Sequence, residues 1–331
     1  MIANLVHHTM NWERRCKSMK KARLIYNPMA GKGKLKAQIP NLLERLNGAG
    51  FEATAYATTG PGDATDEAGR AVDEGVDLII AAGGDGTISE VINGIAPKPK
   101  RPAFAIIPAG TTNDFARALG IPKNYEKAID VIVDGYQIPI DIGKGNDEYF
   151  VYLAGGGRIT NLSHETPSKL KKAIGRPAYF LQGAKMLPQI RHEQIVRIEY
   201  DDEVFEGDIL LFFIANTNSI AGFEKLTPDA IINDGKFDLL IVKKLTVANF
   251  LRLLLLAFRG AHLKSRQLIY TKASRIKVET KADMILNLDG ENGGKFPREF
   301  VNLHQHMKMF VPKPYYEKNQ QMLSKEQEQI L

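Results

Sequence analysis

The alternation of strand-like and helix-like segments between Ala22 and Gly110 constrains the fold more than any other feature of the chain. Runs of apolar and β-branched residues at 22–28, 51–58, 76–82 and 104–110 predict strands. Helical segments separate them. In the first of these, apolar residues lie at i, i+3, i+4 and i+7, namely Ile39, Leu42, Leu43 and Leu46. This order predicts a doubly wound, mainly parallel sheet that binds ligands beyond the carboxyl ends of its strands.

After about Asp141 the pattern changes to strands that are joined mostly by short loops. Strands are expected at residues 149–157, 194–202, 204–216, 236–244, 275–280, 284–291 and 301–312, with helices near 167–186 and 247–259. Such a segment order predicts an antiparallel β-sandwich or barrel. The length of 331 residues likewise favours two domains over one.

Composition limits both the class of protein and its compartment. The formal net charge of +6 suits a phosphate-rich substrate or an anionic membrane surface better than nucleic acid. The single cysteine, Cys16, cannot form an internal disulfide, which indicates the reducing cytoplasm. The first 18 residues lack the apolar core of a signal peptide, and the leucine-rich run at 249–258 is too short to span a bilayer. We therefore expect a cytoplasmic protein without a transmembrane span.

Glycine-rich loops follow three of the predicted strands. "NPMAGKG" (27–33) follows the first strand, "GGDGTISE" (83–90) the third and "AGTTND" (109–114) the fourth. Glycines let the backbone approach a ligand, and helix N-termini expose amides, so these loops predict a phosphate-binding site. A carboxylate there would repel phosphate unless a cation lay between them, so Asp85 predicts a magnesium-bound nucleotide. Taken alone, "GDG" suits a tight turn before a helix N-cap equally well.

Known phosphate-binding motifs of two other classes are missing. Neither the Rossmann pattern G-x-G-x-x-G nor the P-loop pattern G-x-x-x-x-G-K-[ST] follows a predicted strand, which disfavours dehydrogenases and P-loop enzymes.

The loops resemble those of a known family. "GGDGT" after an apolar strand, "NP" and "GK" upstream and "PAGTTNDFAR" downstream are similar to the lipid kinases of the diacylglycerol kinase catalytic family, from Ala22 to about Pro312. The resemblance implies a three-layer α/β nucleotide-binding domain (20–138) and an antiparallel β-sandwich substrate domain (139–309), with the active site in the cleft between them. It also implies that residues 310–323 return to the first domain. Residues 1–19 are expected to be a disordered N-terminal appendage, and residues 324–331 a polar tail.

The resemblance further implies an activity and its partners. We expect ATP- and Mg²⁺-dependent phosphorylation of diacylglycerol to phosphatidic acid, which returns diacylglycerol to phospholipid synthesis. Such an enzyme would be a homodimer, bound peripherally to anionic phospholipid at the inner face of the plasma membrane. The motifs do not separate diacylglycerol from other lipid alcohols such as sphingosine or phosphatidylglycerol. An NAD kinase, which shares "GGDGT", is disfavoured by "PAGTTNDFARALG" and by the late "LDGE".

Site residues follow from the resemblance by position. Glu291 of "LDGE" would be the catalytic base, Asp289 would orient its neighbours, and Asp85, Asp114 and Asp141 would form a water-linked magnesium network. The residues with an expected nucleotide contact are Asn27, Pro28, Met29, Ala30, Gly31, Thr58, Gly84, Asp85, Gly86, Thr87, Ile88, Ser89, Glu90 and Thr111.

A second metal is implied near "TPDAIINDGKF". Asp234 and the carbonyls of Ile231 and Lys236 would hold a structural magnesium, since oxygen ligands suit this hard cation. An Asn-Asp-Gly hairpin turn without metal is the alternative interpretation.

Basic residues are candidates for phosphate and membrane contact. Lys32 and Arg117 are candidates to face phosphate, and Lys169, Lys171 and Lys172 to bind anionic phospholipid. The leucine-rich helix 247–259 has three possible positions, facing the membrane, the core or a dimer partner. The chain departs from the family pattern at Ser89, Gln182 and Asn292, and Gln182 removes one expected membrane-facing charge.

Overall fold

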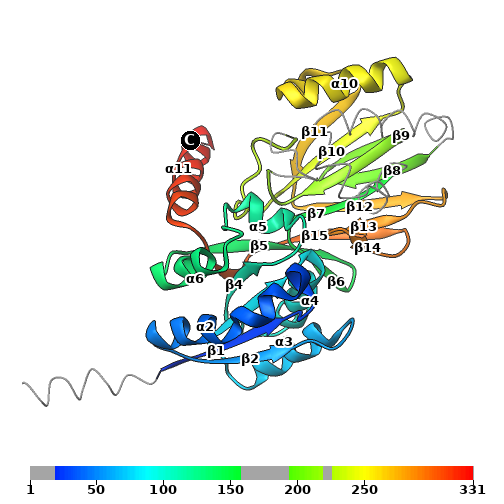
Figure 1. Ribbon diagram of the computed structural model, residues 1–331. Helices are drawn as coiled ribbons and strands as arrows, with labels where there is room; N and C mark the ends of the chain where they lie inside the picture. Colours follow the sequence, from blue (N-terminus) through cyan, green and yellow to red (C-terminus); the bar gives the residue numbers. More distant parts are fainter. Residues whose placement is uncertain (1–18, 158–193, 219–225, 331) are drawn as a thin grey trace, which may run out of the picture.

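The computed structural model describes residues 19–157, 194–218 and 226–330, which form an α/β half followed by a β-rich half (Figure 1). The α/β half consists of β1 (Lys20–Tyr26), η1 (Ala30–Gly33), α2 (Lys34–Gly48), β2 (Phe51–Ala57), α3 (Asp63–Asp73), β3 (Leu78–Gly83), α4 (Asp85–Ile95), β4 (Ala103–Pro108), α5 (Asp114–Ala118) and α6 (Tyr125–Asp134). The rest consists of β5 (Gln137–Gly145), β6 (Glu148–Phe150), β7 (Leu153–Gly157), β8 (Ile195–Tyr200), β9 (Glu203–Ala215), β10 (Phe237–Lys243), α10 (Val247–Arg259), η3 (His262–Lys264), β11 (Leu268–Ala273), β12 (Arg275–Thr280), β13 (Leu286–Leu288), β14 (Glu291–Asn292), β15 (Arg298–Phe310) and α11 (Lys313–Ile330).

The first half is a parallel sheet with helices on both faces. Its strand order is β4-β3-β1-β2, and every pair in it is parallel. The step from β1 to β2 runs in the opposite direction to the steps from β2 to β3 and from β3 to β4. Right-handed crossovers therefore place α2 on one face and α3 with α4 on the other. Gly94 of α4 allows the close packing of these two helices, because a methyl group there would meet the carbonyl oxygen of Thr65 at 2.3 Å.

The second half is a β-sandwich joined to the first sheet. The long strand β9 pairs with β8 in one layer and with β7 and β10 in the other, so it contributes to both. Aromatic rings fill the interior, among them Phe150, Phe212, Phe237 and Phe300, each fully buried. The expected fold, an α/β domain followed by an antiparallel β-sandwich, is confirmed.

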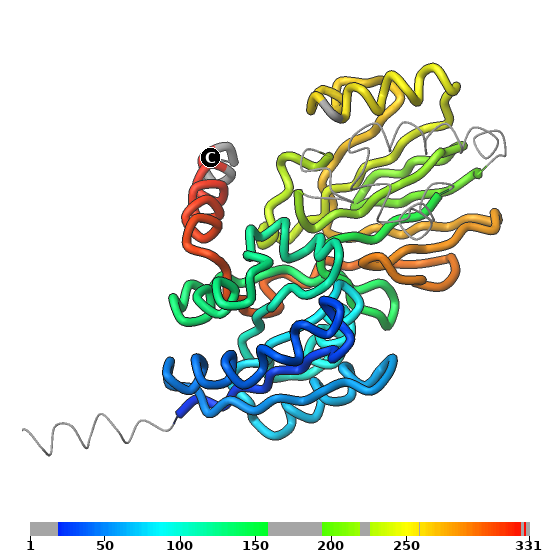
Figure 2. Tube along the Cα trace, viewed as in Figure 1, coloured from blue at the N-terminus to red at the C-terminus, as the bar shows by residue number. Residues whose placement is uncertain are grey.

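The chain returns to the first half near its end. β15 pairs with β12 and β5 in antiparallel fashion, and its Met309 pairs with Phe104 of β4 in parallel. Beyond it the amide of Val311 donates to the carbonyl of Tyr136 (3.0 Å), and the ring centroids of Tyr136 and Tyr316 lie 5.4 Å apart. Figure 2 shows this red segment leaving the sheet beside the green α6 region.

One predicted strand is interrupted. Residues 149–157 were expected to form a single strand, but β6 ends at Phe150 and β7 begins at Leu153. The amides of residues 151–153 donate to the carboxylate of Asp289 instead of a neighbouring strand. The side chain of a residue far along the chain therefore breaks the strand.

The predicted helix 247–259 is confirmed as α10. Thr246 caps its first turn by accepting from the amide of Asn249, and Gly260 ends it with a φ of 70°. Leu253 packs on the sandwich, whereas Leu251 and Leu255 are exposed. Figure 1 shows α10 lying across the end of the sandwich that is farthest from β1 and β2. No helix in the described ranges has the length and apolar character needed to cross a membrane. The predicted helix 167–186 lies outside the described residues.

Candidate active site

The glycine-rich loops meet at the carboxyl edge of the parallel sheet. The carbonyl of Gly83 accepts hydrogen bonds from the amides of Ala109 (2.8 Å) and Gly110 (3.1 Å) and from Nδ2 of Asn113 (3.0 Å). The amide of Asn27, in the first loop, donates to the carbonyl of Ala82 at 3.1 Å. The ends of β1, β3 and β4 thus bring the loops to one place, as expected for ligand binding in a doubly wound sheet.

Asp85 is the first residue of α4 and faces the loop after β4. Its Oδ2 accepts from the amide of Asn113 (2.9 Å) and from the hydroxyl of Thr112 (3.1 Å). Its Oδ1 is buried, and no partner for it occurs within the described residues. Burial, followed by the negative charge of Asp114, raises the pKa of Asp85. Asp114 itself forms an ion pair with Arg117, one turn further along α5.

A buried carboxylate oxygen without a donor is what a hard divalent cation requires. Asp85 therefore fits Mg²⁺ by charge and by ligand type, and Asp114, which pairs with Arg117, adds a second negative charge beside it. Across the described part of the chain, no cluster of three or more His, Cys, Asp or Glu side chains forms a metal site of protein ligands alone. Two carboxylates supplemented by phosphate oxygens and water are the usual arrangement for Mg²⁺ at a nucleotide.

Asp289 anchors the turn between β13 and β14. It adopts a φ of 49°, and its Oδ2 accepts from the amide of Val151 (2.7 Å), while its Oδ1 accepts from those of Tyr152 and Leu153 (both 3.0 Å). Burial raises the pKa of Asp289 to about 7, although the three amide donors favour its ionised form. These bonds fix the position of the turn that carries Glu291.

Glu291 reaches from the sandwich to the α/β half. A methyl group built on Gly86 would lie 3.2 Å from its Oε1, so the carboxylate lies against the first turn of α4, next to Asp85. Both residues of β14 are exposed, so an incoming hydroxyl has access to this carboxylate. The structure therefore brings Asp85 and Glu291 together from opposite halves of the chain.

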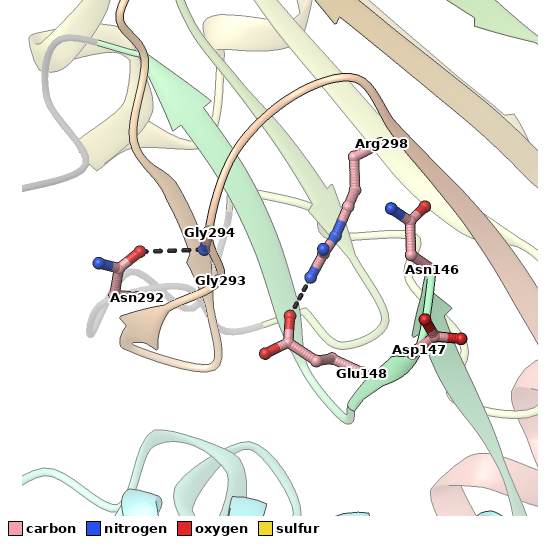
Figure 3. Close-up of a pocket in the computed structure, with 7 residues that line it drawn as sticks. All are labelled: Asn146, Asp147, Glu148, Asn292, Gly293, Gly294 and Arg298. Carbon is pink, nitrogen blue, oxygen red and sulfur yellow. Dashed lines mark hydrogen bonds and ion pairs between the residues drawn. The ribbon is translucent and has the colours of Figure 1, made fainter.

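A polar pocket of about 460 Å³ lies beside this hairpin. Figure 3 shows Asn292, Gly293 and Gly294 on one side and the segment Asn146–Glu148 with Arg298 on the other. Arg298 forms an ion pair with Glu148 at its wall. Its lining includes Asn292, which directly follows Glu291 in the chain.

The residues expected to contact nucleotide have several different surroundings. Gly31 and Gly84 belong to the loop cluster, since methyl groups built on them would contact Ala109 and Gly110 respectively. Within the first loop, the amide of Met29 donates to Oδ1 of Asn27 at 2.9 Å. Pro28 and Ala30 lie in the same first loop, and the amide of Thr58 donates to the carbonyl of Tyr26 (2.9 Å) beside it. Thr111 is exposed in the loop after β4.

The α4 residues divide between the loop side and the core. Thr87 packs on Gly83, and Ser89 uses its carbonyl to accept from Asn93. Ile88 is 1% exposed and packs in the core. Oε2 of Glu90 accepts from the amide of Ala64 (3.3 Å) at the start of α3. The side chains of Ile88 and Glu90 are thus directed to internal packing.

Asp141 has partners different from those of Asp85 and Asp114. Its carboxylate accepts from the amides of Gly235 (2.7 Å) and Gln305 (2.6 Å) and contacts Nδ1 of His304 (3.1 Å). Asp141 thus lies beside the 231–236 turn, where burial is the main cause that raises its pKa.

At that turn a lysine already neutralises the candidate metal ligand. Asp234 forms an ion pair with Lys272 and accepts from the amide of Lys236 at 3.0 Å, while Ile231 is buried. The Lys272 ammonium supplies the positive charge that a bound cation would supply. The carboxylate of Asp234 therefore fits a metal less well than the partnerless oxygen of Asp85 does.

The basic candidates are placed only in part. Lys32 adopts a φ of 59° in the exposed first loop, and Arg117 pairs with Asp114. Lys169, Lys171 and Lys172 lie outside the described residues, as does Gln182.

Sequence reasoning missed two residues that join the halves. Asn93 of α4 donates to the carbonyl of Tyr149 and accepts from its amide, both at 2.9 Å. Tyr152 is 5% exposed and stacks on Phe115. Neither residue belongs to a local motif, because the partners of each are distant in sequence.

Comparison with known proteins agrees with this arrangement. The model of the diacylglycerol kinase catalytic domain matches residues 21–145, and that of the YegS C-terminal NAD kinase beta sandwich-like domain matches residues 161–311. The chain is 52% identical to a diacylglycerol kinase of Bacillus subtilis, over 89% of this chain and 97% of that protein. It is 54% identical to a diacylglycerol kinase of Staphylococcus saprophyticus, over 88% and 96%.

Solved structures agree as well. A crystal structure of a diacylglycerol kinase from Bacillus anthracis is 29% identical and covers 89% of this chain and 98% of its own, with a TM-score of 0.70. These relatives cover both halves of the chain. The chain therefore belongs to the diacylglycerol kinase family.

Proposed function

We propose that the protein transfers the γ-phosphoryl group of ATP to the hydroxyl of diacylglycerol and so forms phosphatidic acid. The observation that carries this proposal is the contact of Glu291 with the first turn of α4, beside Asp85. A phosphoryl donor at the α4 N-terminus and a hydroxyl at Glu291 would then be neighbours, as transfer requires. The named relatives support the choice of substrate.

The donor side is the loop cluster at the sheet edge. Exposed amides at the N-terminus of α4 attract phosphate oxygens, and Gly84, which lacks a side chain, lets the backbone before this helix approach a ligand closely. Asp85 and Asp114 would hold Mg²⁺, which offsets negative charge on the phosphate oxygens when it is bound. The expected contacts of Asn27, Thr58 and Thr111 with nucleotide remain part of this proposal.

The acceptor side is the β13–β14 hairpin. The carboxylate of Glu291 accepts the proton of the lipid hydroxyl as its oxygen attacks phosphorus, and ADP leaves from the opposite side. Asp289 keeps the hairpin in place through its three backbone bonds. This division assigns proton removal to one half of the molecule and phosphate binding to the other.

The substrate requires contact with a membrane surface. We therefore include peripheral binding to anionic phospholipid at the cytoplasmic side of the membrane, with α10 as one contributor because Leu251 and Leu255 are exposed beside Arg252 and Arg259. A homodimer and a structural magnesium at Asp234 complete the proposal. Sedimentation of the purified protein tests the homodimer.

A panel of acceptors tests the activity. Purified protein is incubated with Mg²⁺ and labelled ATP together with micelles of diacylglycerol, sphingosine or phosphatidylglycerol, or with NAD. Label in phosphatidic acid is the expected result, and it should depend on Mg²⁺. Label in another lipid alone would correct the acceptor, and label in NAD alone would overturn the assignment as a lipid kinase.

A further inference from the structure

Tyr152 lies at the break between β6 and β7, where its backbone is fixed from two sides. Its amide donates to Oδ1 of Asp289 and its carbonyl accepts from the amide of Asn216, both at 3.0 Å. The residue is 5% exposed. The position of its side chain is thus set by the same carboxylate that anchors the Glu291 turn.

The ring of Tyr152 joins the two halves of the site. It stacks on Phe115 at 6.4 Å with an interplanar angle of 15°, and Phe115 directly follows Asp114 in α5. Its hydroxyl oxygen points to the other half, where a methyl group on Gly290 would lie 3.5 Å away. Gly290 stands between Asp289 and Glu291. The hydroxyl therefore lies beside the turn that carries the candidate base.

The surroundings of this hydroxyl are negatively charged. Burial is the main cause that raises the pKa of Tyr152, and the negative charges of four carboxylates raise it further: Asp289, Asp85, Asp114 and Glu291. The phenol consequently keeps its proton. No side chain or backbone group in the described ranges accepts a hydrogen bond from it. A fixed donor thus remains available between the candidate phosphate site and the candidate base.

We propose that the hydroxyl of Tyr152 donates a hydrogen bond to the phosphoryl group during its transfer, which makes Tyr152 a further catalytic residue. The inference depends on one part of the proposed function, namely that a phosphoryl group passes from a donor beside Asp85 to a hydroxyl beside Glu291. Negative charge on the phosphoryl oxygens needs donors there, because the nearby side chains are mostly carboxylates. A donor held rigidly by its backbone and ring costs no reorganisation when the reaction occurs.

Tyr152→Phe is the direct test, because it removes one oxygen and keeps the stacked ring. Removing one such preorganised donor is expected to lower kcat about 10²-fold, with the KM for ATP and for the lipid changed by no more than about threefold. ADP formation without acceptor should fall by a similar factor, since the bond is made to the phosphoryl group. Thermal unfolding reports whether the fold is intact.

Tyr200→Phe is the matched control. Tyr200 is also a buried tyrosine, 7% exposed, but it lies in β8 within the sandwich core. Its variant should keep kcat within about a factor of two of wild type. If Tyr152→Phe also kept kcat within that factor, or lost activity only in step with nucleotide affinity and melting temperature, the proposal would be overturned.

The test separates this inference from the choice of acceptor. ADP formation measures phosphate release whatever alcohol receives it. If wild type failed to phosphorylate diacylglycerol but used another acceptor, the proposed function would fail, and Tyr152→Phe would then be compared on that acceptor. A loss of kcat there would uphold the role of Tyr152, and its absence would refute it.

Discussion

The carboxylate of Glu291 lies against the backbone of Gly86, although the two residues are 205 positions apart in the sequence. Oε1 would lie 3.2 Å from a methyl group at Gly86, which is closer than most contacts of a real side chain. Any side chain at position 86 would therefore push this carboxylate slightly away from the first turn of α4. The contact joins the proposed phosphate-binding edge of one half to the candidate base of the other.

Gly86→Ala should lower activity without lowering stability. Alanine is favoured over glycine in a helix by about 0.5–1 kcal/mol, so the free energy of unfolding should be unchanged or slightly higher. The new methyl group displaces the carboxylate of Glu291 by a few tenths of an ångström, and kcat should fall about tenfold because transfer depends on exact positioning. Denaturant unfolding and steady-state kinetics measure the two effects.

Gly48→Ala is the control for that prediction. Gly48 ends α2, and a methyl group there would meet no atom within 4 Å. Its variant should keep the kcat of wild type. Equal kcat values for Gly86→Ala and wild type would mean that the position of Glu291 does not limit the reaction.

Asp289→Asn should destabilise the protein and lower its kcat, because Asp289 holds the turn that carries Glu291. The amide group of asparagine has one acceptor oxygen in place of two, so it leaves at least one of the amides of residues 151–153 without its partner. Loss of a buried hydrogen bond of this kind costs about 1–3 kcal/mol. Chemical denaturation measures this cost, and an unchanged free energy of unfolding would contradict the anchoring role of Asp289.

The same carboxyl predicts a pH dependence of stability. Burial raises the pKa of Asp289 to about 7, so the folded protein holds this proton more tightly than the unfolded chain does. The stabilisation from this group is complete below about pH 4 and is lost as the pH rises through about 7. Between about pH 5 and about pH 8, the free energy of unfolding should therefore fall more steeply in wild type than in Asp289→Asn. Parallel curves for the two proteins would show that the pKa is not raised.

Lys272→Met should destabilise the protein, because it removes the positive partner of Asp234. The Asp234 side chain is 2% exposed, so removal of its ammonium partner leaves a buried carboxylate without compensation. The expected loss is about 2–4 kcal/mol, below the cost of breaking a fully buried pair because Lys272 is 23% exposed. Lys277→Met breaks the exposed pair with Glu279 and should leave the free energy of unfolding nearly unchanged, because solvent screens this pair.

The response of the melting temperature to Mg²⁺ shows whether this ion can replace Lys272 as the positive charge beside Asp234. If this carboxylate can bind a structural cation, Mg²⁺ should raise the melting temperature of Lys272→Met more than that of wild type, by mass action. The double variant with Asp234→Asn should lose this response. Identical magnesium responses in all three proteins would remove Asp234 from the proposed metal ligands.

The fold was predictable because its signals are local. Apolar runs and turn residues give the strands of the parallel sheet, and the interval from Thr246 to Gly260 contains both the cap and the end of α10. The break at Val151–Tyr152 was not predictable, since "YFVYLAGGG" has the composition of one strand. The group that interrupts it, Asp289, lies 137 residues further along the chain from Tyr152.

The site was predictable to a similar extent. Asp85 and Glu291 belong to short motifs, whereas the roles of Asn93 and Tyr152 depend on partners that only the folded chain brings near. Asp141 lies in "IPIDIGKG", which gives no sign of its contacts with Gly235 and Gln305. Long-range contacts of this kind leave no periodic pattern in the sequence.

A double-mutant cycle on Asp85 and Glu291 tests most directly whether both carboxylates serve one transfer step. Phosphatidic acid formation is measured for wild type, Asp85→Asn, Glu291→Gln and the double variant, with folding checked by thermal unfolding. Each single variant should lose at least about 10²-fold in kcat, and the double variant should lose no more than about threefold beyond the slower single. Losses that multiply in the double variant, or a single variant with full activity, would contradict the account.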